Sequence, residues 1–264
     1  MKALAALSSF RGRAPSAIGA PVEAVLLLAM VAVPLPALAQ SIGVADIYFK
    51  DEGSRFGLGS FKALGGAYAV ARLLQAQLSE TLGRPVEMSE VTGRAHPEIV
   101  AGITVCCATD GNHGRSVAWG AQSFGCACVI FIHATVSEAR KSAIAAYGAE
   151  VRRCAGNYDD SVREAQDTAT REGWFVVSDT SYPGYMEVPR DVMQGYELMA
   201  AEAIDALDTP PTHIFLQTGV GGMAAAVTAH VVRKFGPDRP TIVLCDPDKS
   251  ACVLATVQAG APTA

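Results

Sequence analysis

Short apolar runs alternate with amphipathic segments along most of the chain. The apolar runs are rich in β-branched residues and cysteine, which predicts strands at 44–49, 103–109, 127–132, 150–154, 174–178, 213–217 and 241–245. The segments between them predict helices at about 62–81, 113–124, 137–147, 158–172, 189–206 and 222–235. Several strands lack polar alternation, as expected when both faces of a parallel sheet are buried. The pattern therefore predicts an α/β fold built from βαβ units, with a polar, proline-containing loop at 84–98.

The N-terminal pattern allows two interpretations. The apolar stretch 24–39 follows basic residues and ends in Ala-Leu-Ala, which is similar to a secretory signal and its cleavage site. Glu23 directly before the stretch, and Pro34 and Pro36 within it, argue against that interpretation. The alternative is an extended segment that enters a buried helix in LPALAQSIG and ends at Gly43. We expect the buried helix and a cytoplasmic protein, with export as the alternative.

Composition narrows the classes of function. Half of the residues are hydrophobic and 18% are charged, which excludes a disordered chain. The formal net charge is -5 and the basic residues are scattered, so we expect no nucleic-acid partner. The seven cysteines are an odd number, and those at 106, 107, 126 and 128 lie in predicted strands without a zinc-binding spacing. We therefore expect buried, reduced thiols and no metal, and the prolines in the apolar stretch leave no membrane span.

The segment GSFKALGG at 59–66 contains the first candidate catalytic residue. Lys62 stands between apolar residues and glycines at a predicted helix start, with no carboxylate nearby in sequence. An amine desolvated there would have a lowered pKa and could act as a nucleophile or a base. A solvated surface lysine is the alternative.

The turn Thr109-Asp-Gly-Asn-His-Gly114 connects a predicted strand to a predicted helix. Such a junction favours anion binding, because free amides and the helix dipole point at the turn. Asp110 could be a helix N-cap instead. His113 at the first helical turn is interpreted as a packing residue.

A glycine loop, Gln217-Thr-Gly-Val-Gly-Gly-Met223, follows the next candidate strand and precedes an apolar helix. Its amides could wrap one phosphate group. The spacing Gly219-x-Gly221-x-x-Ala224, followed by Asp246 after the next strand, also fits a dinucleotide fingerprint. That alternative predicts NAD binding, although the acid is distant and few residues follow it.

Taken in order, the stretches SFKALGGAYA, TDGNHGRSVAW and QTGVGGM resemble the fold-type II pyridoxal 5'-phosphate enzymes, the group with threonine dehydratase and tryptophan synthase β. Within this group, YFKDEGSRFGLGSFKALGGAYAV, VSDTSYPGYMEVPRDVMQGYELM and PTHIFLQTGVGGMAA are most similar to the diaminopropionate ammonia-lyase family. The resemblance covers roughly residues 34–259. It implies a tryptophan synthase β-like fold, with a large cofactor-binding domain from 1–66 and 186–264 and a small inserted domain at 67–185.

The resemblance also implies roles for individual residues. Lys62 matches the lysine that forms a Schiff base with pyridoxal phosphate, and Asn112 matches the asparagine that hydrogen-bonds the pyridine 3-hydroxyl. The phosphate-holding loop matches Gly219, Val220, Gly221, Gly222 and Met223. Asp110 replaces the serine usual in related dehydratases, and in the lyase family it is the base for the D-isomer while the lysine serves the L-isomer. Asp179 matches a further active-site acid.

These roles imply elimination of ammonia from 2,3-diaminopropionate, an amino-acid substrate, to give pyruvate and ammonia. Members of the family continue well beyond the position matching Ala264, so we expect a C-terminally incomplete chain that forms a homodimer when complete. The alternatives are a serine or threonine dehydratase-like enzyme and an inactive truncated remnant.

Overall fold

The computed structural model describes residues 32–261, which form two compact units. One unit, here unit 1, contains residues 62–195. The other, unit 2, contains residues 32–61 and 196–261. The division falls inside helix α10 (Glu187–Asp205), so unit 2 is assembled from two separate stretches of the chain. The domain boundaries that the resemblance implies stay a prediction.

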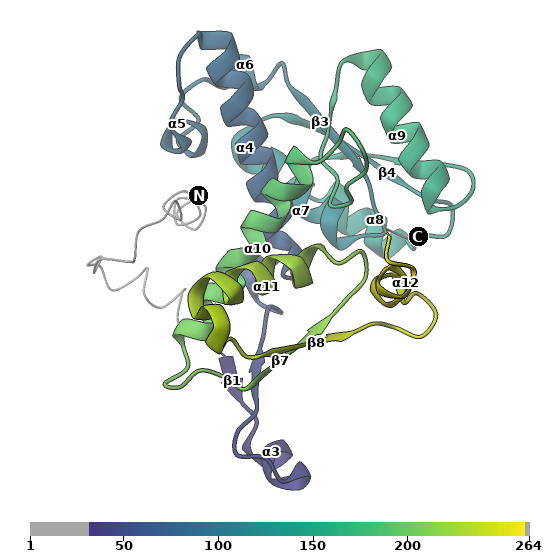
Figure 1. The fold of residues 1–264 in the computed structure, drawn as a ribbon. Helices are drawn as coiled ribbons and strands as arrows, with labels where there is room; N and C mark the ends of the chain where they lie inside the picture. Colours follow the sequence, from purple (N-terminus) through teal and green to yellow (C-terminus); the bar gives the residue numbers. More distant parts are fainter. Residues whose placement is uncertain (1–31, 262–264) are drawn as a thin grey trace. The chain divides into compact units, whose positions relative to one another are not determined.

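Unit 1 is built on a four-stranded sheet with the order β5-β4-β3-β6. All neighbouring strands are parallel, as the strand–helix alternation predicts. The strands are β3 (Thr104–Ala108), β4 (Ala127–Ile132), β5 (Glu150–Arg153) and β6 (Phe175–Val176). The helices are α4 (Lys62–Leu82), α5 (Met88–Thr92), α6 (Pro97–Val100), α7 (Asn112–Phe124), α8 (Glu138–Ala145), α9 (Tyr158–Glu172) and the first part of α10 (Figure 1).

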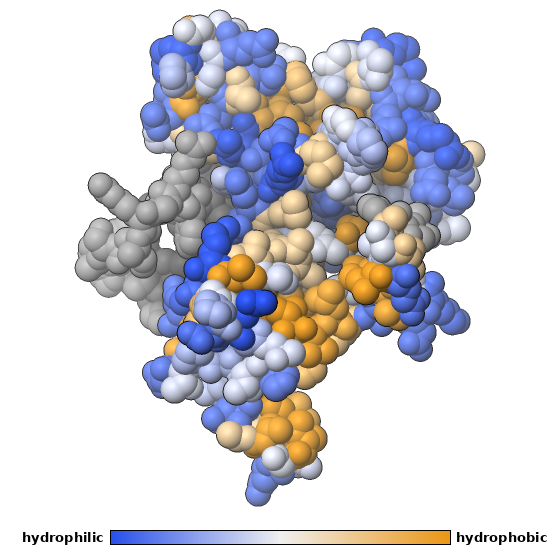
Figure 2. Space-filling view, viewed as in Figure 1, coloured by the Kyte–Doolittle hydropathy of each residue, from blue (hydrophilic) through white to orange (hydrophobic). Residues whose placement is uncertain are grey.

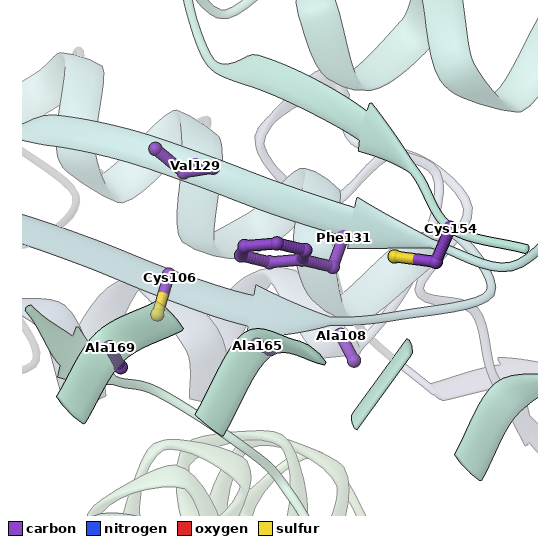
Figure 3. Close-up of a cluster of buried hydrophobic side chains, with 7 residues drawn as sticks. All are labelled: Cys106, Ala108, Val129, Phe131, Cys154, Ala165 and Ala169. Atoms are coloured by element: carbon purple, nitrogen blue, oxygen red, sulfur yellow. The ribbon is translucent and has the colours of Figure 1, made fainter. Parts of the chain in front are cut away.

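Helices cover both faces of this sheet. On one face, side chains of β3 and β4 pack against Ala165 and Ala169 of α9, and Figure 3 shows this cluster with Phe131 at its centre. On the other face, a methyl group added to Gly114 of α7 would come within 3.1 Å of Ile130. Strands buried on both faces explain why their sequences lack polar alternation.

Helices α4 and α7 pack at a distance that only small residues permit. A methyl group added to Gly120 would lie 2.8 Å from the Cα of Ala67, and one added to Gly66 would lie 2.6 Å from Ser116 Oγ. Ser116 Oγ also accepts a hydrogen bond from the Ala67 amide and donates to the Ala63 carbonyl. This close contact fixes the first turns of α4, and therefore the backbone of Lys62.

The predicted loop at 84–98 is partly wrong, because it contains the short helices α5 and α6. The Glu90 carboxylate accepts hydrogen bonds from the Glu87 amide and from the Arg84 guanidinium, which stabilises the start of α5. Pro97 begins α6, where the missing amide hydrogen has no consequence. Proline and polar residues occur both in loops and at helix starts, and here they begin two short helices.

Unit 2 contains an antiparallel pair, β1 (Ala32–Pro34) with β2 (Tyr48–Lys50), and a parallel pair, β7 (His213–Gln217) with β8 (Thr241–Cys245). The remaining elements are α3 (Pro36–Ile42), η1 (Arg55–Gly57), the second part of α10, α11 (Gly222–Phe235), η2 (Gly236–Asp238) and α12 (Cys252–Ala259). The sequence analysis predicted neither the antiparallel pairing nor α12. The predicted strand at 44–49 is reduced to its last two residues plus Lys50.

Helix α3 forms where LPALAQSIG predicted a helix, and Gly43 ends it in the left-handed conformation with φ 74°. The expected burial is wrong, because Ala39 is its one buried residue and Ile42 keeps 61% of its surface exposed. Figure 2 shows hydrophobic side chains gathered at α3. Most of the apolar stretch at 24–39, with the signal-like interpretation that depends on it, lies outside the described residues.

A buried charge cluster connects the two stretches of unit 2. Arg55, which is 2% exposed, binds Glu52 with two hydrogen bonds of 2.7 Å and also binds Glu202 of α10. Lys50 Nζ lies 2.8 Å from Glu202 and 3.1 Å from Glu52. Burial alone would raise the pKa of Glu202, but hydrogen bonds from Arg55 and Lys50 outweigh it and lower that pKa.

Candidate active site

Lys62 is the first residue of α4, and its side chain forms an ion pair within unit 1. Lys62 Nζ donates to Asp179 Oδ2 across 2.6 Å, although the two residues are 117 positions apart in sequence. The Lys62 side chain is 32% exposed, so it is less desolvated than the sequence predicted. The fold therefore supplies the carboxylate that the local sequence lacks and leaves the amine accessible.

Asp179 follows β6, and its side chain, which is 12% exposed, contacts several groups of unit 1. His113 Nδ1 lies 3.8 Å from its Oδ2 atom, and His113 Nε2 lies 2.7 Å from the Val177 carbonyl. Burial would raise the pKa of Asp179, but the charges of His113 and Lys62 and the hydrogen bond from Lys62 lower it to about 2. His113 is buried, as expected of a packing residue, and it also faces this carboxylate.

The turn between β3 and α7 is stabilised by Thr109. Its hydroxyl accepts hydrogen bonds from the amides of Gly111 and Gly114. The helix N-cap is Gly111, with φ 157°, so the alternative role of Asp110 as an N-cap is wrong. A methyl group added to Gly114 would lie 2.4 Å from Thr109 Cγ2, which restricts that position to glycine. The turn presents Asn112 exposed at the first residue of α7.

Asp110 forms a contact that the sequence analysis missed. Its Oδ1 atom lies 3.0 Å from His133 Nε2, and His133 Nδ1 lies 3.0 Å from Thr135 Oγ1. His133 is the first residue after β4, and Asp110 is the second residue after β3. Inspection of the end of the predicted strand ACVIFI would have found it, because functional side chains of α/β folds gather beyond the carboxyl ends of strands.

The glycine loop lies in unit 2, between β7 and α11. Gly221 is the N-cap of α11 with φ 87°, a conformation that favours glycine, and α11 has no side-chain cap. The Ala225 amide donates to the Gly221 carbonyl, so the amides that precede Ala225 in the first turn have no helical acceptor. Space around Gly219 is open, Val220 is exposed, and Met223 is buried beneath the helix start.

Asp246 after β8 supports this loop. One carboxylate oxygen accepts a hydrogen bond from the Thr218 hydroxyl, and the other accepts the Leu254 amide at 2.9 Å. Both oxygens of the acid are therefore engaged within unit 2. This gives Asp246 a structural role in place of the ribose contact that the dinucleotide alternative required.

Other predicted features can be compared directly with the structure. Cys106, Cys107, Cys126 and Cys128 are free and buried, and burial raises the pKa of each thiol. Within residues 32–261, no three His, Cys, Asp or Glu side chains are grouped to hold a metal ion. In the same range, no helix combines the length and apolar character that crossing a membrane requires.

Known proteins with similar sequences include ammonia-lyases and dehydratases. Diaminopropionate ammonia-lyase of Escherichia coli strain K12 is 40% identical over 221 residues, which are 82% of this chain and 54% of that protein. A mouse serine dehydratase-like protein is 29% identical over 156 residues, covering 59% of this chain and 45% of its own length. The chain thus spans about half the length of the curated relatives that it matches.

Solved structures extend the comparison to the fold. A holo diaminopropionate ammonia lyase from Escherichia coli superposes with a TM-score of 0.80 at 38% identity, covering 88% of this chain and 59% of that one. A tomato threonine deaminase has a TM-score of 0.65 at 19% identity, covering 94% and 62% of the two chains, and shows the fold alone. These likenesses confirm the predicted fold class.

The family of pyridoxal-phosphate dependent enzymes matches residues 29–264, nearly the whole chain. That match includes Lys62 in unit 1 and the glycine loop in unit 2. The chain belongs to the pyridoxal-phosphate dependent enzyme family.

Proposed function

We propose that this chain acts in the elimination of ammonia from 2,3-diaminopropionate, whose aminoacrylate product takes up one water to yield pyruvate and a second ammonia. The proposal rests on the position of Asp110. Its carboxylate lies beyond the end of β3, in the same unit as the ion pair between Lys62 and Asp179. A substrate with a second amino group is a cation at that position, and a carboxylate attracts it. The similarity to diaminopropionate ammonia-lyases supports the same substrate.

The residues present fit pyridoxal phosphate. Lys62 is an accessible amine at the start of a helix held by close packing, and α11 begins with amides that no side chain caps. A phosphate group bound there would complete the helix terminus. The proposed cofactor-binding residues are Lys62, Asn112, Gly219, Val220, Gly221, Gly222 and Met223. When bound, the cofactor supplies a conjugated ring that accepts the electrons released at the α-carbon of the amino acid.

The acid–base roles belong to side chains of unit 1. We propose that Lys62 receives the α-proton of the L-isomer and Asp110 that of the D-isomer. Asp179, whose pKa is about 2, stays ionised at neutral pH and orients the Lys62 amine. Catalytic roles are therefore proposed for Lys62, Asp110 and Asp179.

Four wider features belong to the same proposal. The large domain would comprise residues 1–66 and 186–264, and the small domain residues 67–185. The enzyme would be cytoplasmic and homodimeric, with a small amino acid as its partner. Light scattering of the purified chain tests the dimer.

The test of the function is a visible absorption spectrum of the purified chain with added pyridoxal phosphate, beside Lys62→Ala. A long-wavelength band, and cofactor retained on a Lys62 peptide after borohydride reduction, are the expected results. Pyruvate release from each isomer of diaminopropionate then tests the substrate. A folded wild type without the band would contradict cofactor binding and favour the inactive remnant.

The second candidate is a serine or threonine dehydratase-like activity, which the similarity to serine dehydratase-like proteins favours. The two candidates differ at Asp110. If Asp110→Ser deaminates serine while losing diaminopropionate turnover, Asp110 determines the substrate as proposed. If the wild type itself prefers serine, the dehydratase activity is the function.

A further inference from the structure

The register of the unit 1 sheet brings Asp110 and His133 together. In the parallel pair β3–β4, which Figure 1 shows side by side, Ala108 lies opposite Phe131. Asp110 and His133 each stand two residues beyond these paired positions. Their contact, 3.0 Å between Oδ1 and Nε2, therefore follows from strand pairing as well as from the side-chain conformations.

The second ring nitrogen of His133 has its own partner. Thr135 Oγ1 lies 3.0 Å from Nδ1. A hydroxyl that donates to Nδ1 leaves the proton of the neutral ring on Nε2, which then donates to the Asp110 carboxylate. The chain Thr135–His133–Asp110 thus has a consistent direction of donation.

The backbone that carries His133 is held by Arg153, the last residue of β5. Arg153 Nη1 donates to the carbonyls of His133, Ala134 and Val136, and Nη2 pairs with Glu138 at 2.6 Å. On the other side, Arg140 approaches the Asp110 carbonyl at 3.5 Å. The ring is therefore presented from a fixed strand end and not from an unrestrained loop.

Exposure differs between the two members of the pair. The Asp110 side chain is 66% exposed and that of His133 is 18% exposed. An exposed aspartate samples several rotamers unless a partner holds it. The bond from the less exposed ring holds Oδ1 and leaves Oδ2 available to a ligand or a proton.

We propose that His133 is a positioning residue that orients Asp110 and thereby controls turnover of the isomer whose α-proton Asp110 receives. The inference rests on the proposed function. It adds a residue whose hydrogen bonds within unit 1 include those to Asp110, Thr135 and Arg153.

Kinetics on both isomers with the full chain loaded with pyridoxal phosphate provide the first test. His133→Leu removes the donor, whereas His133→Gln keeps an N–H group near the position of Nε2. We expect His133→Leu to lower kcat for the D-isomer about tenfold, to lower kcat for the L-isomer much less, and His133→Gln to restore most of the loss. His213→Leu, an exposed histidine at the start of β7, is the matched control and should leave both rates unchanged.

Histidine side-chain nitrogen NMR provides a readout that does not depend on activity. The chain has five histidines, and His133→Gln assigns the signal of interest. We expect the neutral His133 ring to carry its proton on Nε2, Thr135→Val to mix the two tautomers, and Asp110→Asn to shift the Nε2 resonance. A proton on Nδ1, or a signal indifferent to Asp110→Asn, would overturn the inference.

The outcomes separate this inference from the proposed function. If the wild type turns over neither isomer, the proposed function fails, and the NMR comparison alone decides whether His133 orients Asp110. If His133→Leu slows both isomers equally and His133→Gln restores neither, the positioning role is wrong and His133 acts only in the structure.

Discussion

Two strand–turn–helix junctions of the molecule have the same order of elements but differ at the helix start. Between β3 and α7, the Thr109 hydroxyl accepts the amides of Gly111 and Gly114. Between β7 and α11, the Thr218 hydroxyl is turned to Asp246, and no side chain caps the helix. The first junction satisfies two of its amides within the turn and presents side chains. The first-turn amides of the second have no side-chain acceptor, an arrangement that favours an anion.

The surroundings of the two junctions differ as well. The first belongs to a four-stranded sheet whose apolar side chains are buried on both faces. The second belongs to a two-stranded sheet on which Phe215 remains 68% exposed, within a unit stabilised by the charge cluster at Arg55. Unit 1 therefore depends on close apolar packing, and unit 2 depends more on buried ion pairs.

The largest expected effect tests the charge cluster of unit 2. Arg55→Ala leaves Glu52 and Glu202 without the guanidinium, and breaking a buried pair in this way costs about 3–5 kcal/mol. Urea unfolding followed by circular dichroism, with hydrogen exchange of α11 peptides, measures the loss. Arg233→Ala removes an exposed pair with Glu197 and should cost at most about 1 kcal/mol. Equal losses in the two variants would contradict the comparison.

Gly120→Ala tests the close packing of unit 1. The added methyl group would lie 2.8 Å from the Cα of Ala67, so α4 and α7 must separate, at about 3 kcal/mol. Fluorescence-monitored unfolding reports this unit specifically, because Trp119 and Trp174 both lie in it. The exposed helix position Gln122→Ala should change stability by less than about 0.5 kcal/mol. A similar result for both variants would show that the helices are not tightly packed.

Asp179→Asn tests how much the ionised Asp179 carboxylate contributes to the stability of unit 1 at different pH values. The pKa of Asp179 falls from 3.8 to about 2 on folding, so its ionised form contributes roughly 2 kcal/mol at neutral pH. That contribution is present above pH 4 and is lost as the pH falls toward 2. The stability difference between wild type and Asp179→Asn should therefore shrink on acidification, as urea titrations at several pH values would show. A difference that is constant with pH would mean that His113 and Lys62 together do not stabilise the ionised Asp179 carboxylate.

The smallest expected effect compares the two threonines directly. Thr109→Val removes the acceptor for two amides at the start of α7 and should cost about 1 kcal/mol. Thr218→Val should cost less, because the Thr218 hydroxyl caps no helix. Thermal unfolding of both variants measures the difference. A larger loss for Thr218→Val would show that the glycine loop, and not the first junction, depends on its threonine.

Much of the fold could be predicted from local pattern. The strands at 127–132, 213–217 and 241–245 and the helix at 158–172 match their predicted limits, because periodicity and turn residues act over a few positions. The short helices α5 and α6 were missed, since fewer than two turns give no clear periodicity. Burial of α3 was predicted wrongly, because an apolar segment does not specify what covers it.

The sequence by itself determined the α/β class, the lysine at a helix start and the two glycine-containing turns, because these depend on residue type and short spacing. Tertiary structure decided which groups those residues meet. Asp179 reaches Lys62 across 117 positions, His133 reaches Asp110 through strand register, and Glu202 reaches Arg55 across 147 positions. Such contacts arise from the packing of distant elements, and no local pattern encodes the partner.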